Sequence, residues 1–209
     1  MKKNSAFATT CLWDLSKSLT ATYGNDKGGK IFNSAESILC EEFLRVNDRS
    51  NKMIGRHICR NILPGFACYR AMLDAGICGP EAVEFVRTQL CRSAERMERL
   101  CKRLSSKKYA YGLIRIIIGG ALKYGYPKQG WTVAILENNK ERIRFDITSC
   151  LYCEELQERG ALELCPAFCD TDVVSYGPLA PAVIFKREGT LAQTGVKCDF
   201  CFENGTISK

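Results

Sequence analysis

The residues best suited to chemistry gather in the last third of the chain, where six cysteines are interspersed with acidic residues. The cysteine spacings are C-x2-C, C-x3-C and C-x2-C. Thiols beside carboxylates can bind a metal, carry out redox chemistry or activate a nucleophile, but free cysteines also pack as small buried hydrophobes. The reactive residues of this stretch, which runs from Ser149 to Phe202, are Cys150, Cys153, Cys165, Cys169, Asp170, Asp172, Cys198, Asp199 and Cys201.

Cys150 is the cysteine with the clearest local signal. Thr148 or Ser149 is expected to cap a short helix ending at Gly160, which puts Cys150 in its first turn. Unpaired backbone N–H groups and the positive end of the helix dipole lower a thiol pKa, so we expect a thiolate there. With Cys153 on the same face, the pair also has a redox spacing, and the following C-x3-C approaches zinc-site spacing. Metal binding, redox chemistry and core packing all remain open.

Other catalytic arrangements have little support in the sequence. His57 is the only histidine, so any Cys-His or Ser-His-Asp arrangement must use it, and it lies in a basic helical stretch typical of a solvated surface. The chain contains no G-x-S-x-G, no Walker loop and no G-x-G-x-x-G. Catalysis is therefore expected to depend on carboxylates and thiols, with or without a metal.

The composition is that of an ordinary globular protein, with 209 residues, 46% hydrophobic and 25% charged. No apolar run is long enough to cross a bilayer and no secretory signal is evident, so we expect a cytoplasmic protein whose thirteen cysteines are reduced. Ten basic and only two acidic residues lie between Val86 and Tyr124. We expect most of this charge to form a solvated helix face, not a nucleic-acid site. Its arginines at helical spacing are Arg92, Arg96, Arg99 and Arg103.

The helices and strands that position the thiols are predicted from the spacing of apolar residues, which changes near Pro127. Before it, apolar residues recur at helical spacing, and after it they alternate. We expect an α+β fold, with N-terminal helices packed on a C-terminal antiparallel sheet, as a single domain over 1–209. The helical part covers about 31–125, and the sheet and cysteine-rich part about 129–203. Expected helices are about 34–46, 51–62, 66–75, 80–104 and 107–124; expected strands lie near 131–135, 143–147, 183–185 and 198–202; residues 23–29 are expected to form a loop.

One family is similar to this pattern. The segments FDITSCLYCEELQERGALELCPAFCDTD and FKREGTLAQTGVKCDF resemble the L-2-amino-thiazoline-4-carboxylic acid hydrolase family. LPGFACYRAML, from Leu63, and the Gly130-Trp131 start of the hairpin look similar too. The matching features are Phe145, Asp146, Cys150, Tyr152, Gly160, Glu163, Leu164, Cys169, Asp172, Arg187, Thr190, Leu191, Gly195, Cys198, Asp199 and Phe200, whereas Cys153, Cys165 and Cys201 depart from the pattern.

The resemblance implies a hydrolase that opens a cyclic amidine-like thiazoline ring by water attack, giving an N-carbamoyl amino acid. It also implies a divalent metal, manganese or zinc. The catalytic residues would be Cys169, Asp172 and Cys198, the substrate-binding residues Arg187 and Asp199, and the metal ligands Cys150, Cys169 and Cys198. Without a metal, Asp172 could itself be the base for water.

A more distant similarity, to 4-vinyl reductase domains, implies an alternative function of a different class. The protein would then be a non-catalytic sensor that binds a small molecule or a metal. Turnover of a thiazoline would favour the enzyme, and tight binding without turnover would favour the sensor. In either case the expected partner is a small molecule, with no nucleic acid and no membrane; a homo-oligomer is allowed by either reading.

Overall fold

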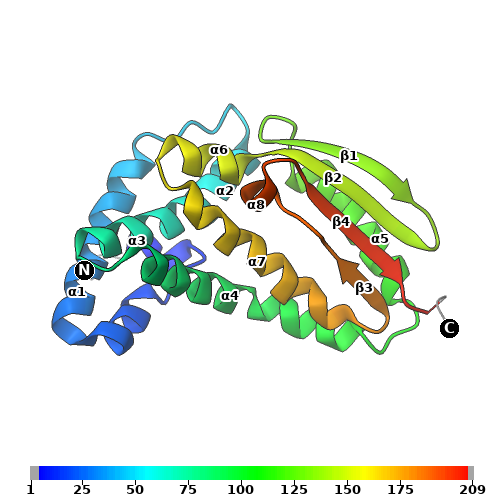
Figure 1. The fold of residues 1–209 in the computed structure, drawn as a ribbon, viewed down its shortest axis with the longest axis horizontal. Helices are drawn as coiled ribbons and strands as arrows, with labels where there is room; N and C mark the ends of the chain where they lie inside the picture. Colours follow the sequence, from blue (N-terminus) through cyan, green and yellow to red (C-terminus); the bar gives the residue numbers. More distant parts are fainter. Residues whose placement is uncertain (1–4, 207–209) are drawn as a thin grey trace. The chain divides into compact units, whose positions relative to one another are not determined.

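The computed structural model describes residues 5–206, and it builds helices first and a sheet afterwards (Figure 1). The expected α+β fold is confirmed. In chain order the elements are η1 (Ala6–Thr9), α1 (Leu15–Phe43), α2 (Lys52–His57), η2 (Ile58–Ile62), α3 (Leu63–Asp74), α4 (Gly79–Leu104), α5 (Ala110–Gly120), η3 (Ala121–Gly125), β1 (Trp131–Asn138), β2 (Arg142–Cys150), α6 (Leu151–Glu158), η4 (Leu162–Leu164), α7 (Cys165–Tyr176), η5 (Gly177–Leu179), β3 (Val183–Lys186), α8 (Leu191–Thr194) and β4 (Cys198–Asn204).

These elements divide into two compact units. One contains the chain up to residue 93 together with 155–167, and the other contains 94–154 together with the chain from 168 onward. The expectation of a single domain stays a prediction. Among the described residues 5–206, no helix is long and apolar enough to span a membrane.

In the first unit, α1 corrects the expected loop at 23–29. Helix extends through this segment, and the backbone leaves it only at Gly24, with φ 78° and ψ 169°. That conformation is open to glycine alone, so one residue turns the chain where a longer loop was expected. At Gly28, a Cβ would lie 2.5 Å from the Leu19 carbonyl oxygen, so a second glycine lets the two halves of α1 approach closely.

The second unit contains a four-stranded sheet in the order β1-β2-β4-β3, with every neighbouring pair antiparallel. The expected hairpin is confirmed as β1 and β2. Its turn is held by Asn139, whose side-chain oxygen accepts hydrogen bonds from the backbone N–H groups of Glu141 and Arg142 at 2.8 and 2.9 Å. From α5, the Tyr111 hydroxyl donates to the Asn139 carbonyl at 2.8 Å, which fixes this helix to the turn.

Aromatic rings form the core over this sheet. Phe145 on β2 stacks on Phe200 of β4 with ring centroids 4.9 Å apart. Phe202, two residues further along β4, meets Phe185 of β3 at 5.0 Å and Tyr176 of α7 at 5.2 Å. Figure 1 shows α7 beside β3 and β4, as these ring contacts require. The strand alternation expected from the sequence therefore supplies the surface against which α7 packs.

We expect Ile143→Val to lower the free energy of unfolding by about 1 kcal/mol, because one buried methylene is lost from β2. Ile143 is 2% exposed, whereas Ile135, on the neighbouring strand β1, is 57% exposed. The matched control Ile135→Val should change stability by less than about 0.5 kcal/mol. Urea unfolding of both variants measures the difference, and equal effects would contradict the assignment of the core face.

The arginine stripe of α4 is exposed along its length, as expected. Arg99 forms an ion pair with Glu95 at 3.2 Å, which is ordinary chemistry for a solvated helix face. The expectation that the stripe binds no nucleic acid stays a prediction.

Candidate functional site

Asp172 lies on the face of α7 that carries Phe168 one turn earlier and Tyr176 one turn later. The Phe168 ring meets Tyr152 at 5.3 Å, and Tyr176 meets the aromatic rings of the sheet. The segment from Cys165 to Cys169 opens this helix. The helix thereby places a carboxyl group between two aromatic contacts.

Arg187, one residue beyond β3, holds Asp172 in place. Its Nη1 donates to Asp172 Oδ2 at 2.8 Å, and its Nη2 donates to the Cys169 carbonyl at 3.1 Å. The guanidinium also lies over the Phe200 ring, 5.5 Å from its centroid. The Arg187 side chain is only 7% exposed, so the guanidinium side of this ion pair is buried, while Asp172, 29% exposed, keeps a path to solvent.

The pKa of Asp172 is raised to about 6. Burial is the main cause, the nearby Asp170 charge adds to it, and the Arg187 guanidinium lowers the pKa in opposition. A carboxyl group with a pKa near the working pH is ionised often enough to accept a proton and acidic enough to return it. Asp172 thus has the properties of a general base.

The same pKa predicts how stability changes with pH. The folded pKa of about 6 exceeds the unfolded value of 3.8, so the native state binds more protons than the unfolded state between these limits. The stabilisation that Asp172 contributes is therefore fully present below its unfolded pKa. It is lost as the pH rises through the folded pKa, and the total loss in the free energy of unfolding is about 2–3 kcal/mol. Urea unfolding across this window should show the loss in the wild type and not in Asp172→Asn. Parallel curves for the two proteins would contradict the raised pKa.

Cys198 is the buried thiol at the start of β4. Its Sγ accepts a hydrogen bond from the backbone N–H of Leu191 at 3.2 Å. Burial raises its pKa to about 11, the Cys169 and Cys153 thiols add to the rise, and the Leu191 amide and Arg187 oppose it. Cys198 therefore keeps its proton at neutral pH.

Cys150 differs from the expectation in place and in charge. It is the last residue of β2, and α6 begins one residue later. Backbone N–H groups of Tyr152 and Cys153 do point at its sulfur and lower its pKa, as a helix start should. The hydrogen bond with the Cys153 thiol, followed by burial, outweighs them and raises the pKa of Cys150, so the predicted thiolate is corrected to a thiol.

A series of thiols is connected through pKa effects: the Cys153 thiol raises the pKa of Cys150, and the Cys153 and Cys169 thiols raise the pKa of Cys198. Cys153 departs from the family pattern, and sequence analysis paired it with Cys150 but not with Cys198. Within residues 5–206, no three His, Cys, Asp or Glu side chains are grouped so as to hold a metal ion. We therefore derive no step through a metal, and the ligand set Cys150, Cys169 and Cys198 stays a prediction.

Asp199 holds the loop that carries Arg187. Its carboxylate accepts hydrogen bonds from the backbone N–H groups of Glu188, at 3.1 and 3.2 Å, and of Gly189, at 2.8 Å. These contacts fix the chain between β3 and α8, next to the guanidinium. The structure thus gives Asp199 a positioning role, and its role in binding substrate stays a prediction.

Tyr126 is a site residue that sequence analysis did not select. It follows the π-helix η3, and its ring meets Trp131 edge-on at 5.1 Å. Burial raises its pKa well above the ordinary value, and the charge of Asp172 adds to this rise, followed by smaller effects of Tyr176, Tyr152 and Cys150. Its hydroxyl therefore stays protonated, within electrostatic range of the Asp172 carboxyl group. The signal available in the sequence was an aromatic residue directly before Pro127, where the helices end.

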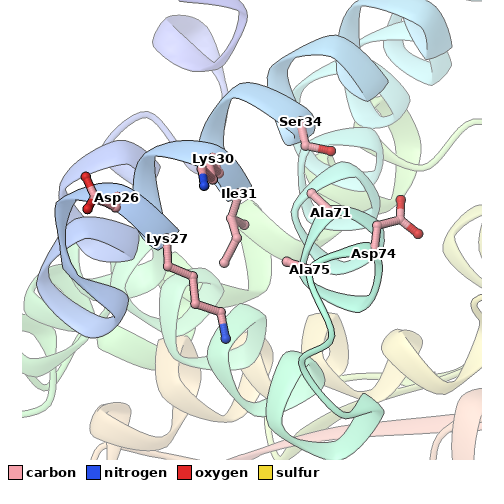
Figure 2. Close-up of a pocket in the computed structure, with 8 residues that line it drawn as sticks. All are labelled: Asp26, Lys27, Lys30, Ile31, Ser34, Ala71, Asp74 and Ala75. Atoms are coloured by element: carbon pink, nitrogen blue, oxygen red, sulfur yellow. The ribbon is translucent and has the colours of Figure 1, made fainter.

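A cavity of about 530 Å³ lies elsewhere, in the first unit (Figure 2). Its apolar lining is Ile31 of α1 with Ala71 and Ala75 at the end of α3, and charged or polar side chains surround these residues. The charged and polar residues are Asp26, Lys27, Lys30, Ser34 and Asp74. The lining contains no cysteine, and the candidate active site is the one around Asp172 in the second unit.

Fold and site define the chain as an α+β protein in which a carboxyl group of raised pKa and a buried guanidinium meet beside a series of thiols. The sequence model of the L-2-amino-thiazoline-4-carboxylic acid hydrolase family matches residues 55–202. That range exceeds half of the chain, so the chain belongs to this family, and membership supports a hydrolase-like function. No curated protein and no solved structure matches the chain significantly.

Proposed function

We propose that the protein is a cytoplasmic hydrolase that opens the ring of a 2-amino-thiazoline-4-carboxylic acid or a similar cyclic amidine. The observation that carries this proposal is the pair of Asp172 and Arg187, in which a carboxyl group with a pKa of about 6 is held by a buried guanidinium. Family membership supports the substrate class. The expected product is an N-carbamoyl amino acid bearing a free thiol.

In the proposed reaction, water attacks the ring carbon that lies between nitrogen and sulfur. Asp172 takes a proton from the water and passes it to the ring nitrogen, which receives the electron pair of the C=N bond. The hydroxyl of the resulting tetrahedral intermediate then gives its proton to Asp172 while the C–S bond breaks, and its electron pair stays on sulfur. Asp172 finally protonates that sulfur. One carboxyl group thus acts twice as base and twice as acid, and it ends as it began.

Arg187 is the group we propose to bind the substrate carboxylate. A guanidinium has five N–H donors. The hydrogen bonds to Asp172 and to the Cys169 carbonyl use one donor on Nη1 and one on Nη2. The remaining donors suit a planar carboxylate. Binding there would bring the ring to the carboxyl group that activates water, with the protonated thiol of Cys198 and the thiol of Cys169 beside the leaving sulfur. A manganese or zinc ion stays a prediction, which elemental analysis of protein purified without oxygen tests.

A panel of cyclic amidines tests the proposal, with the appearance of free thiol as the readout. We expect release from 2-amino-thiazoline-4-carboxylic acid and much slower release from the analogue without its carboxylate, because Arg187 would lack a partner. Binding without thiol release from any member of the panel would contradict the hydrolase and favour the sensor.

A further inference from the structure

Helix α5 is apolar on both of its faces. Tyr111, Ile114 and Ile118, spaced three and four residues apart, form its buried face. The opposite face carries Ile116 and Ile117, and both are exposed, Ile116 to 75%. A helix that is apolar all round is normally covered on every side. Residues 5–206 therefore leave the outer face of α5 largely uncovered.

An exposed tyrosine stands at each end of this outer face. Tyr109 directly precedes α5, about two helical turns before Ile116, and Tyr124 follows the helix in η3. We call the surface formed by Tyr109, Ile116, Ile117 and Tyr124 the α5 face. Tyrosine is enriched where a membrane meets water, because its ring is apolar and its hydroxyl is polar. The α5 face thus combines an apolar centre with amphipathic ends.

The chain around the α5 face is basic without interruption. Between Glu98 and Glu137 the sequence contains no acidic residue, whereas eight of its residues are lysine or arginine. Lys107 and Lys108 precede α5, Lys123 follows it, and all three are exposed. An exposed apolar helix face with lysines at both ends is the pattern of a helix that lies in the interface of an anionic membrane.

We propose that the α5 face binds the surface of an anionic lipid bilayer. The isoleucines enter the boundary of the acyl chains, the tyrosines lie at the level of the headgroups, and the lysines attract the anionic lipids. A second copy of the chain fits the face poorly, because a two-fold axis there brings lysines against lysines. A nucleic acid offers charge but no apolar partner for the isoleucines. Interfacial binding needs no spanning helix, so it agrees with the lack of one in residues 5–206 and revises the expectation of no membrane partner.

Co-sedimentation of the full-length protein with lipid vesicles tests the proposal. One set of vesicles is pure phosphatidylcholine, and the other contains equal parts of phosphatidylcholine and phosphatidylserine. We expect binding to the anionic vesicles, much weaker binding to the neutral ones, and an affinity that falls as salt is added. Replacing Lys107, Lys108 and Lys123 together by glutamine should weaken binding to the anionic vesicles by about 100-fold, since each basic residue near such a surface contributes about fivefold.

Ile116→Gln tests the apolar part of the α5 face without changing its charge. We expect about tenfold weaker binding to the anionic vesicles, because an inserted isoleucine is lost. The matched control is Leu44→Gln, since Leu44 is even more exposed than Ile116 but follows Glu41 and Glu42 instead of lysines. The control should bind as the wild type does, and far-UV circular dichroism should show that both variants keep the fold.

Three vesicle results would overturn the proposal: no binding to either kind of vesicle, equal binding to both, or undiminished binding of Ile116→Gln. Size-exclusion chromatography without lipid gives a further check. A dimer that Ile116→Gln dissociates would also overturn the proposal, because a second copy would then cover the α5 face. None of these readouts needs turnover, so they are independent of the proposed hydrolase activity.

Discussion

Asp172→Asn should lower kcat for thiazoline ring opening by about 10²–10⁴-fold, the usual contribution of a general base. The amide keeps the size of the carboxyl group and can still accept the hydrogen bond from Arg187, but it cannot take a proton from water. KM should change little, because the guanidinium remains to bind the substrate. Steady-state kinetics with thiol release as the signal measures both constants.

Asp170→Asn is the matched control for this change. Asp170 is a neighbouring carboxylate on α7 whose charge contributes to the raised pKa of Asp172. Its removal should leave activity nearly intact and shift the acid limb of the pH profile slightly lower, because the pKa of Asp172 falls. If Asp172→Asn keeps activity similar to that of Asp170→Asn, the base lies elsewhere.

Arg187→Met should lower the free energy of unfolding by about 1.5–3 kcal/mol, because Asp172 loses its charged hydrogen-bond donor. The Cys169 carbonyl also loses its donor and Phe200 loses the cation over its ring. The pKa of Asp172 should rise above its present value of about 6, since the guanidinium now lowers it. Urea unfolding measures the stability of the variant. An upward shift of the acid limb of its pH–activity profile reports the raised pKa of Asp172.

Arg187→Lys separates charge from geometry. A lysine keeps the positive charge near Asp172 but cannot span the carboxylate and the Cys169 carbonyl with a planar fork. We expect it to retain part of the stability and a nearly normal acid limb, with weaker substrate binding. If Arg187→Met matches the wild type in stability and in pH profile, the ion pair does not set the properties of Asp172.

The sequence predicted the sheet because alternation directly reports which residues face the core. Phe200 and Phe202 lie on the face of β4 that carries Cys198, as their spacing requires. The loop expected at 23–29 in α1 was wrong, because residue types that favour turns do not report how a segment packs. One glycine outside helical φ/ψ is enough to turn a chain, and flanking residues that favour turns can still be helical when they pack.

The charge state of Cys150 could not be derived from its place in the sequence. Helix-start amides lower a thiol pKa, and they do so here, but the larger effects come from burial and from the Cys153 thiol. Burial depends on tertiary packing, which the local sequence does not report. The pairing of Asp172 with Arg187 was hidden for a similar reason, since fifteen residues separate them and only the loop held by Asp199 brings the guanidinium back to α7.

Hydrolysis of 2-amino-thiazoline-4-carboxylic acid in heavy-oxygen water tests the central claim most directly, with wild type and Asp172→Asn run in parallel. Mass spectrometry of the product gives the position of the label. If Asp172 activates water against the ring carbon, the wild type forms a thiol product with one heavy oxygen in its carbamoyl group, and Asp172→Asn forms almost none. Equal label from both proteins, or no labelled thiol from the wild type, would contradict the proposed mechanism.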